Sequence, residues 1–554
     1  MDGSVLLLQV GAACLALWAV AAVIQFVMLR RDARLPQTEL RAPLLTEMIE
    51  YRLDAALRSR KEWTRKLDIA GKLFWYRDAG PADASDSRVL CPGYVVHFCS
   101  DASSRVTIAL TETALDITKA GLTREADSVA MVLIDASRAD PARLPVSNDD
   151  LESKRQVVSL ASLPFPTKYA HFVKATAELL EISSSSDKEV IKLDIKRERI
   201  FQDSIEALVM IPSDNMRTAA IRIHFCDEAG VDAGGLQREW FGLLNQCLVG
   251  KDTRIDTSGC VFRCVNKEEP AFYLNQNSAQ DLGEHHLMCF YGVGRLIGRA
   301  LLEGNMMGFH LSLPLLKIIL GLPVAFSDLK YFDPGVYKSL LWLEENQGAK
   351  SLGLTFSITE QGGWIVDLIP NGRHIDVVDD NKHEYLERRF RYTLFESVSS
   401  QLYVFLKGLY EVVPQELLMI FDPEELDYLL CGSDEIDVDE WMLYTTCSEN
   451  LRDHQVLTWF WEIVREMPNE YRRRLLQFAT AASRVPVTGF SALTSYDGRL
   501  CLFTLKGVPL EGDGHIRSHA CFNRLDLPLH VSRAQLQAVL YAAIERDVYG
   551  FTTN

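Results

Sequence analysis

The feature that most constrains this chain is a run of twenty-five residues, 5–29, that contains no charged side chain. As a helix the run would be roughly 37 Å long, which is enough to cross the hydrocarbon core of a bilayer with some tilt. Arg30 and Arg31 follow it, and the positive-inside rule then places the rest of the chain in the cytosol. The sequence therefore predicts an N-terminal transmembrane anchor over residues 1–31 of a single-pass membrane protein. A signal sequence and a buried core helix are the alternatives.

Composition narrows what the remainder of the chain can be. The chain has 554 residues, of which 48% are hydrophobic and 24% are charged, as expected of a globular protein. This length is typical of about two to four domains. Its 58 Lys and Arg against 75 Asp and Glu give a formal net charge of −17. Because phosphate binding needs clustered Lys and Arg, this balance argues against nucleic acid as the main partner and would suit a basic protein.

The twelve cysteines have no regular spacing. In a chain of this length they indicate reduced thiols and not a disulfide framework. The tightest pair is Cys260 and Cys264, and no second pair lies near it at the spacing of a zinc finger. His285 and His286 are adjacent, and adjacent histidines rarely bind one ion together. The sequence therefore predicts no metal and no cofactor.

Two stretches carry only coarse information. Apolar residues at helical spacing between Leu44 and Leu57 predict an amphipathic juxtamembrane helix within residues 32–62. Residues 93–163 mix short β-branched runs with polar turns, and the sequence assigns them to no domain. From Lys192 to the C-terminus, helical patterns rich in aromatic residues alternate with short strands.

A segment at residues 63–92 resembles the first half of a WW domain. Trp63 is followed by a turn at Gly71 and by the aromatic run Lys72–Tyr76. WW domains use such aromatic residues to bind proline-rich segments. The segment is predicted to be degenerate, because Ser85 stands about where the second signature Trp would fall. A plain hairpin with a packed aromatic cluster is the alternative.

The last cysteine, Cys521, lies among residue types that suit nucleophilic chemistry. Neighbouring His519 and Arg524 could lower the pKa of its thiol and so raise the fraction of thiolate. A thiolate can attack a carbonyl or another thioester. Asn523 could donate a hydrogen bond to a developing oxyanion, and Asp526 could orient a base or help to deprotonate an incoming amine.

Two alternatives compete with a catalytic interpretation of this cysteine. Most cysteines are inert core residues. A papain-like protease would place its cysteine early in the catalytic domain, with a histidine far downstream. Only thirty-three residues with one histidine, His530, follow Cys521. This order disfavours a protease.

The string from Ser518 to Pro528 closely resembles the active-cysteine motif of HECT-type ubiquitin-protein ligases. Four further segments resemble motifs of the same family in order and spacing, so the similarity covers about Pro164 to Asn554. Other short segments look most like the WW-containing branch of the family. The four family segments are Phe225–Phe241, Phe290–Leu301, Asp367–Arg373 and Leu475–Thr480. The segments that resemble the branch are Ile420–Asp422, Cys431–Gly432 and Trp459–Trp461.

The resemblance implies a bilobal α+β fold behind the predicted transmembrane helix. A large, mostly helical N-lobe, residues 164–446, would recruit the ubiquitin-conjugating enzyme. A small α/β C-lobe, residues 453–554, would carry the cysteine. We expect the hinge between them in the polar stretch 447–452, because a hinge needs residues that tolerate large backbone changes.

The resemblance also implies roles for individual residues around the cysteine. Cys521 would carry ubiquitin as a thioester, with His519, Asn523 and Asp526 in supporting roles. Phe551, near the C-terminus, would help the transfer from thioester to lysine.

Two positions depart from the family pattern, and one further site is implied. Ala520 replaces the Thr that usually precedes the cysteine, so any hydroxyl role there is lost. Ala481 replaces a usual Gly, and neither change removes the nucleophile. A groove that binds the conjugating enzyme is expected at five apolar residues. These residues are Leu340, Leu341, Trp342, Leu354 and Phe356.

The predicted function is that of a HECT-type ubiquitin ligase at the cytosolic face of a membrane. The Cys521 thiolate would accept ubiquitin from a conjugating enzyme, and a substrate lysine would then attack the thioester and form an isopeptide bond. This transfer would direct substrates, some with proline-rich motifs, to degradation or sorting. Thioester exchange is nearly isoenergetic, so no cofactor is required. The alternative is a catalytically silent, membrane-anchored adaptor with a HECT-like fold.

Overall fold

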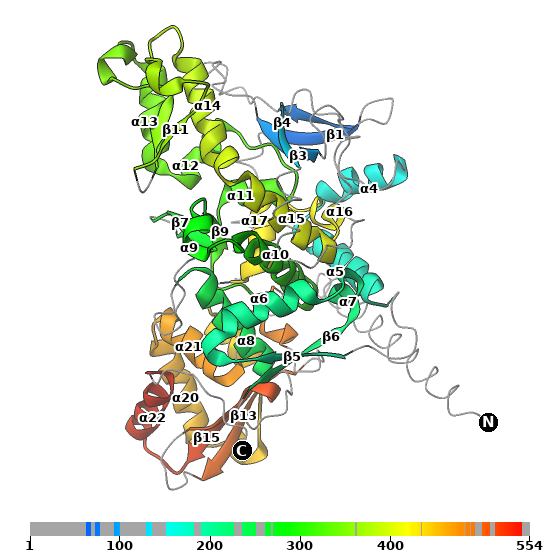
Figure 1. Ribbon diagram of the computed structural model, residues 1–554. Coiled ribbons are helices and arrows are strands. Elements are labelled where there is room, and N and C mark those ends of the chain that lie inside the picture. The colour runs from blue at the N-terminus through cyan, green and yellow to red at the C-terminus, as the bar shows by residue number, and fades with distance from the viewer. Residues whose placement is uncertain are drawn as a thin grey trace, which may run out of the picture. The chain divides into compact units, whose positions relative to one another are not determined.

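The computed structural model describes most of the chain between Trp63 and Glu545 as helices, strands and the turns that join them (Figure 1). The described residues are 63–67, 73–77, 93–99, 129–135, 151–181, 190–226, 235–250, 261–267, 270–360, 363–433, 435–480, 482, 484–487, 489–493, 501–509 and 516–545.

The predicted N-terminal transmembrane helix is not supported. No helix in the part of the chain that the structure describes is long and apolar enough to span a bilayer. The predicted anchor, residues 1–31, and the predicted juxtamembrane helix, residues 32–62, themselves lie outside the described residues. The fold class is therefore corrected to a mixture of helices and strands, and the single-pass membrane localisation is withdrawn.

Two antiparallel hairpins come first along the described chain. β1 (Trp63–Leu67) pairs with β2 (Leu73–Arg77), so the segment predicted to be WW-like contains a hairpin, which suits both interpretations of it. β3 (Tyr94–Cys99) pairs with β4 (Ala130–Asp135) in the region that the sequence left unassigned. The first residue of β3 exchanges two backbone hydrogen bonds of 2.9 Å with Val324. This second hairpin is therefore fixed to the larger core that follows.

A large and mostly helical hydrophobic core begins at Tyr94 and ends at Cys431, and we call it the N-terminal core. Its short sheets pair β5 with β6 in parallel, β7 with β8 and β10 with β11 antiparallel, and β8 with β9 in parallel. Its strands are β5 (Val190–Ile195), β6 (Ala220–Phe225), β7 (Phe262–Asn266), β8 (Ala271–Leu274), β9 (His310–Leu311), β10 (Ser357–Thr359) and β11 (Ile365–Asp367). Its helices, with α4 before them, are α4 (Leu151–Ala161), α5 (Phe165–Glu181), α6 (Ile200–Met210), α7 (Ser213–Thr218), α8 (Gly235–Leu248), α9 (Ser278–Leu282), α10 (His286–Glu303), α11 (Leu313–Ile319), α12 (Leu329–Phe332), α13 (Pro334–Glu345), α14 (Lys382–Leu394), α15 (Ser399–Val412), α16 (Gln415–Leu418) and α17 (Pro423–Cys431).

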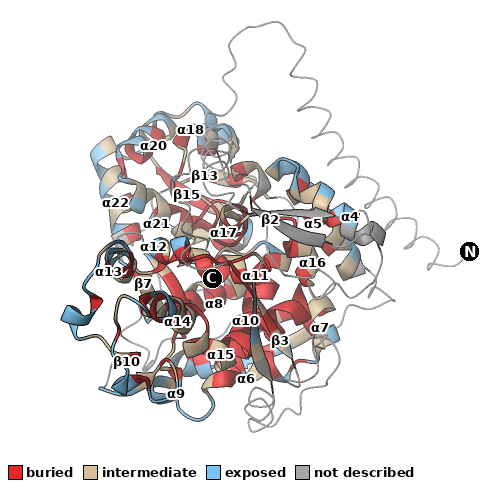
Figure 2. Cartoon of the chain, turned by 90° about the horizontal axis from the view of Figure 1, so that it is seen from above, coloured by how far each residue is buried: buried red, intermediate tan, exposed pale blue. Residues whose placement is uncertain are grey.

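The centre of the N-terminal core is the pair of helices α10 and α15. Figure 2 shows α10 and α11 coloured as buried, whereas outer helices such as α13 and α22 (Arg533–Glu545) carry exposed faces. Gly294 lets the two backbones approach closely, because a Cβ there would lie 2.2 Å from the carbonyl oxygen of Phe405. The buried Arg295 guanidinium is paired with the Glu411 carboxylate across the same contact, with Nη2 and Oε2 2.7 Å apart. A buried charge is tolerated when it is paired in this way.

A second hydrophobic core begins at Ile436 and ends at Ile544, and we call it the C-terminal core. Its sheet has the strand order β12-β13-β15-β14, in which only β14 runs antiparallel to its neighbour. Trp441 is fully buried at its centre and stacks on Phe490, with ring centroids 5.1 Å apart. The elements are α18 (Val438–Leu443), β12 (Thr445–Cys447), α19 (Glu449–Arg452), α20 (Gln455–Glu466), α21 (Asn469–Thr480), β13 (Phe503–Pro509), β14 (Ser518–His519), β15 (Arg524–Leu529) and α22 (Arg533–Glu545).

The stretch 447–452, predicted to be a hinge, lies inside the C-terminal core. Its first residue ends strand β12, and most of the rest forms α19. The side chain of Asn450 donates from Nδ2 to the carbonyl oxygen of Gly507 at 2.9 Å. The polar side chains of this stretch therefore bond it to β13.

The two cores divide earlier in the chain than the sequence predicted. Cys431 is the last residue of the N-terminal core and Ile436 is the first of the C-terminal core. The predicted N-lobe, residues 164–446, includes α18 and most of β12, and these elements pack in the C-terminal core. The physical reason is the burial of Trp441 against aromatic rings of the C-terminal core.

Candidate functional site

Cys521 lies in a short turn next to the edge strand of the C-terminal sheet. The turn η11 (Ala520–Phe522) joins β14 to β15, which run antiparallel with His519 opposite Arg524. Asn523 closes the turn with a left-handed backbone, at φ 47°, a conformation that Asn adopts more readily than most residues. The structure describes the backbone of Cys521, and the side chain of Cys521 lies outside the description.

Asn523 is fully buried and holds this turn through its side-chain amide. Its Nδ2 donates to the carbonyl oxygen of Cys501 at 2.8 Å, and its Oδ1 accepts from Nη1 of Arg238 at 3.2 Å. Arg238 belongs to α8, and it also donates to the carbonyl oxygen of Thr480 at 3.2 Å. These contacts link the turn to the N-terminal core. They favour a positioning role for Asn523 over the predicted donation to an oxyanion.

Asp526, on β15, lies between two basic side chains beside the same turn. Nε2 of His519 is 3.2 Å from one carboxylate oxygen, and Nε of Arg524 is 3.0 Å from the other. The Arg524 contact is an ion pair by distance, although its N–H is not aligned for a hydrogen bond. Asp526 is nearly buried, whereas about a third of the His519 side chain is exposed. His519 is therefore the member of this pair that an amine arriving from solvent can reach.

The residue that follows the cysteine is exposed, which the sequence does not reveal. Phe522 has 53% of its surface exposed. Exposed aromatic side chains of this kind are typical anchors of protein interfaces. The identity of a single aromatic residue does not indicate whether its side chain is buried, so no signal in the sequence could have identified the exposure of Phe522. The carbonyl oxygen of Phe522 also accepts from Sγ of Cys501 at 3.3 Å, a contact that joins segments far apart in the chain.

The residues predicted to form a groove for the conjugating enzyme do not all reach the surface. Trp342 on α13 is 51% exposed, and Leu341 and Leu354 are half-buried. Leu340 and Phe356 are buried in the N-terminal core and cannot contact a partner in this arrangement. Their assignment is corrected, because α13 turns Leu340 inward while it turns Trp342 outward.

Other exposed apolar side chains in the same part of the chain were not predicted. Trp364, just before β11, is 68% exposed, and Leu352, Ile365 and Ile375 are also exposed. Residues 342–375 therefore contain two exposed tryptophans, of which the sequence analysis identified one.

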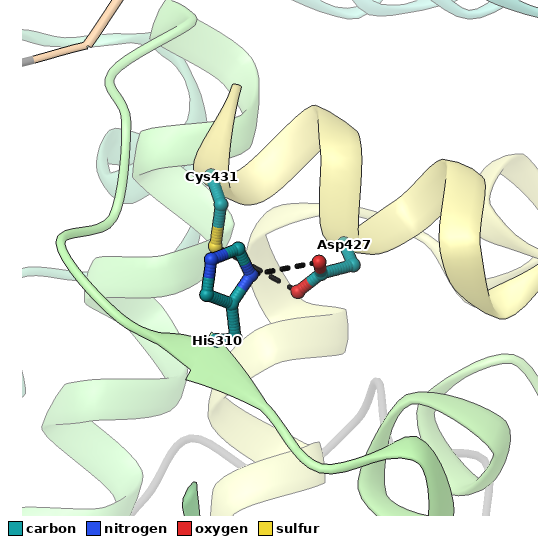
Figure 3. A group of neighbouring side chains, drawn as sticks. All are labelled: His310, Asp427 and Cys431. Atoms are coloured by element: carbon teal, nitrogen blue, oxygen red, sulfur yellow. Dashed lines mark hydrogen bonds and ion pairs between the residues drawn. The ribbon is translucent and has the colours of Figure 1, made fainter. Parts of the chain in front are cut away.

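A separate group of titratable side chains lies in the N-terminal core, where β9 meets the last turn of α17 (Figure 3). Nδ1 of His310 is 2.8 Å from a carboxylate oxygen of Asp427, and Sγ of Cys431 donates to the carbonyl oxygen of Phe309 at 3.1 Å. Burial, with the charge of Asp427 as a second cause, raises the pKa of the Cys431 thiol to about 11. His310 and Asp427 are 117 positions apart, so spacing in the sequence could not reveal the group.

One predicted site residue cannot be placed. Phe551 lies outside the described residues, which end at Glu545. Of the predicted catalytic set, the structure therefore brings together the backbone of Cys521 with His519, Asn523 and Asp526. A cysteine in such a turn, next to a His–Asp pair, can act as a nucleophile that accepts and passes on an acyl group.

Comparisons with known proteins agree on one family. The family model described as HECT-domain (ubiquitin-transferase) matches residues 248–554. The E3 ubiquitin-protein ligase TOM1-like of Neurospora crassa is 36% identical over 366 residues, which are 65% of this chain and 9% of that protein. The probable E3 ubiquitin-protein ligase TOM1 of Eremothecium gossypii is 33% identical over 475 residues, 81% of this chain and 14% of that protein.

A shorter relative is similar to the same extent. The E3 ubiquitin-protein ligase pub1 of Schizosaccharomyces pombe is 33% identical over 359 residues, 64% of this chain and 45% of that protein. The chain thus covers less than a sixth of the length of the first two relatives and less than half of pub1.

Proposed function

Because this chain belongs to the HECT family of ubiquitin transferases, we propose that it is a ubiquitin-protein ligase that carries ubiquitin on Cys521. The observation that carries the proposal is the position of Cys521 in the η11 turn, within the matched region and beside the His519–Asp526 pair. Its partners would be ubiquitin, a ubiquitin-conjugating enzyme and substrate proteins. Transfer to substrates would direct them to degradation or sorting.

The reaction has two steps, and each exchanges one bond for another. The Cys521 thiolate attacks the carbonyl carbon that links ubiquitin to the conjugating enzyme, and the thiolate of that enzyme leaves. A lysine amine of the substrate then attacks the new thioester, an isopeptide bond forms, and the Cys521 thiolate leaves. The amine loses its proton in the second step, and the partly exposed His519, oriented by Asp526, is placed to accept it.

The conjugating enzyme is proposed to bind near residues 342–375. Trp342 and Trp364 are the largest exposed apolar side chains there, and tryptophans are frequent anchors of interfaces. Leu341 and Leu354, half-buried, would line the rim of that site. The hairpin β1–β2 is proposed to bind proline-rich segments of substrates, as its resemblance to a WW domain suggests.

Transfer between two bound proteins requires the Cys521 turn to move relative to the N-terminal core. The segment 432–435, between the two cores, is the proposed hinge. Gly432 at its start has φ 65°, a backbone conformation that few other residues adopt easily. The motion would break the contact of Arg238 with Asn523 and form it again.

A reconstituted reaction tests the proposal against the alternative of a silent adaptor. The full chain is incubated with activating enzyme, conjugating enzyme, ubiquitin and ATP, and is then run on a non-reducing gel. A ligase gives a ubiquitin adduct that thiols release and that Cys521→Ala abolishes. A chain that binds the loaded conjugating enzyme but forms no such adduct is an adaptor, and the proposal then fails.

A further inference from the structure

Three side chains with metal-binding atoms meet at the end of α17 (Figure 3). Asp427 and Cys431 are four residues apart on α17 and therefore lie on the same face of the helix. His310 reaches them from β9. One donor atom from each residue lies within 4.8 Å of the other two. Because the donors come from a helix and a strand of a packed core, their positions are set by rigid elements.

Two of the distances within the group can be compared with those around a small tetrahedral ion. Zinc binds thiolate sulfur at about 2.3 Å and carboxylate oxygen or imidazole nitrogen at about 2.0–2.2 Å, which separates neighbouring ligand atoms by roughly 3.5 Å. Sγ of Cys431 lies 3.7 Å from Oδ1 of Asp427, close to that separation. His310 Nδ1 and Asp427 Oδ2, now 2.8 Å apart, would have to separate by less than about 1 Å.

The charge and the solvent accessibility of the site both favour a divalent metal ion. One thiolate and one carboxylate neutralise a divalent cation, so the loaded site leaves no net charge in a partly buried place. The side chains of His310 and Asp427 are 35% and 27% exposed, so an ion can enter from solvent and keep a water as its fourth ligand. Hard cations such as Mg²⁺ and Ca²⁺ prefer oxygen ligands alone, which this group does not provide.

A Cys–His–Asp alignment could also form a nucleophilic triad, but the burial of the thiol disfavours that interpretation. Cys431 is only 1% exposed, so no protein or peptide substrate could reach its sulfur in this arrangement. A metal ion does not need a path of that width. The same burial that excludes a substrate protects a metal–thiolate bond from exchange with solvent.

We propose that His310, Asp427 and Cys431 bind one zinc ion, which ties β9 to the last turn of α17. Binding forms a bond from zinc to Sγ, and the thiol proton leaves to solvent. The ion would fix the residue directly before the proposed hinge 432–435. The carbonyl oxygen of Cys431 accepts from Nη1 of Arg484 at 2.9 Å, so the same turn also contacts the chain beyond the hinge.

A cobalt titration of the full chain, first stripped of metal with a chelator, tests the proposal. Co²⁺ replaces zinc in tetrahedral sites, and a cobalt–thiolate bond adds a charge-transfer absorption in the near ultraviolet. We expect one Co²⁺ per chain with this absorption, displaced by one equivalent of Zn²⁺. Cys431→Ser should abolish the absorption, and Asp427→Asn and His310→Gln should weaken binding at least tenfold. Cys264→Ser, which removes a thiol elsewhere in the N-terminal core, should bind like the wild type.

Two results would overturn the proposal. One is the absence of a cobalt–thiolate absorption in the wild type. The other is an absorption that survives Cys431→Ser, since the ion would then be held by another thiol, such as that of Cys521. If Cys431→Ser does not fold, the cobalt affinity of Asp427→Asn decides the question. An affinity for Co²⁺ equal to that of the wild type would refute the proposed site. None of these readouts depends on ubiquitin transfer, so the result is independent of the proposed function.

Discussion

The close packing of α10 on α15 makes a quantitative prediction for Gly294→Ala. The new Cβ would lie 2.2 Å from the carbonyl oxygen of Phe405 and 2.9 Å from the backbone nitrogen of Leu409, whereas contacts under 3.0 Å are essentially never seen for a real Cβ. Both neighbours are backbone atoms of a buried helix, so no side chain can rotate away. The helices must therefore separate along the centre of the N-terminal core.

The cost of that separation can be estimated from related substitutions. Forcing extra atoms into a well-packed core costs about 1–3 kcal/mol, and the rigid neighbours here place Gly294→Ala near about 3 kcal/mol. Alanine is favoured over glycine inside a helix by about 1 kcal/mol, which offsets part of the cost. The net expectation is that Gly294→Ala lowers the free energy of unfolding by about 2 kcal/mol.

Gly242→Ala is the matched control, because Gly242 lies inside α8 and a Cβ there would meet nothing within 4 Å. It should raise the free energy of unfolding by about 0.5–1 kcal/mol. Urea unfolding of both variants and the wild type, followed by circular dichroism, gives the comparison. The reasoning is refuted if Gly294→Ala unfolds at the same urea concentration as the wild type or at a higher one.

Three further predictions concern docking, pH and proton transfer. Trp342→Ala should slow the loading of Cys521 more than tenfold at limiting conjugating enzyme, because truncating a hot-spot aromatic costs about 2 kcal/mol or more. Single-turnover loading measures this rate. An unchanged rate would show that the conjugating enzyme docks elsewhere. Burial, followed by the charge of Asp422, raises the pKa of Glu425 from 4.5 to about 7. The stability that this group adds is therefore complete below about pH 4.5 and is lost as the pH rises through about 7. Urea unfolding at several pH values measures this loss, and Glu425→Gln should make the free energy of unfolding depend less on pH. An unchanged pH dependence in the variant would exclude Glu425 as its source. Asp526→Asn should slow the transfer of ubiquitin to lysine by about a hundredfold and leave loading unchanged, and equal effects on both steps would argue for a structural role alone.

The sequence predicted the family correctly, because the family is recognised by short motifs that the chain carries in order. That Cys521 is the nucleophile remains a proposal. The turn around Cys521 is one of these motifs, and its residues His519, Asn523 and Asp526 do lie together. The contact of Arg238 with Asn523 could not be predicted, because it joins residues 285 positions apart. Pairing over such a distance is set by the packing of the two cores and not by local pattern.

The errors in the sequence analysis have local causes. The family resemblance implies a hinge, and the polarity of 447–452 placed it there, whereas the structure shows Asn450 of this stretch bonded to β13. Leu340 and Trp342 are both apolar residues of one helix, and only the packing of α13 shows that the first is buried and the second exposed. The transmembrane prediction depended on hydropathy alone, and no helix among the described residues supports it.

The most direct test of the account is the location of the ubiquitin adduct itself. A serine at position 521 should trap ubiquitin as an oxyester that survives reduction, since an oxyester resists thiols and transfers slowly. Tryptic digestion and mass spectrometry of Cys521→Ser, loaded by a conjugating enzyme, should then find the C-terminal Gly-Gly of ubiquitin on position 521. An adduct on another residue, or no adduct while the wild type still transfers ubiquitin to lysine, would contradict the claim that Cys521 carries it.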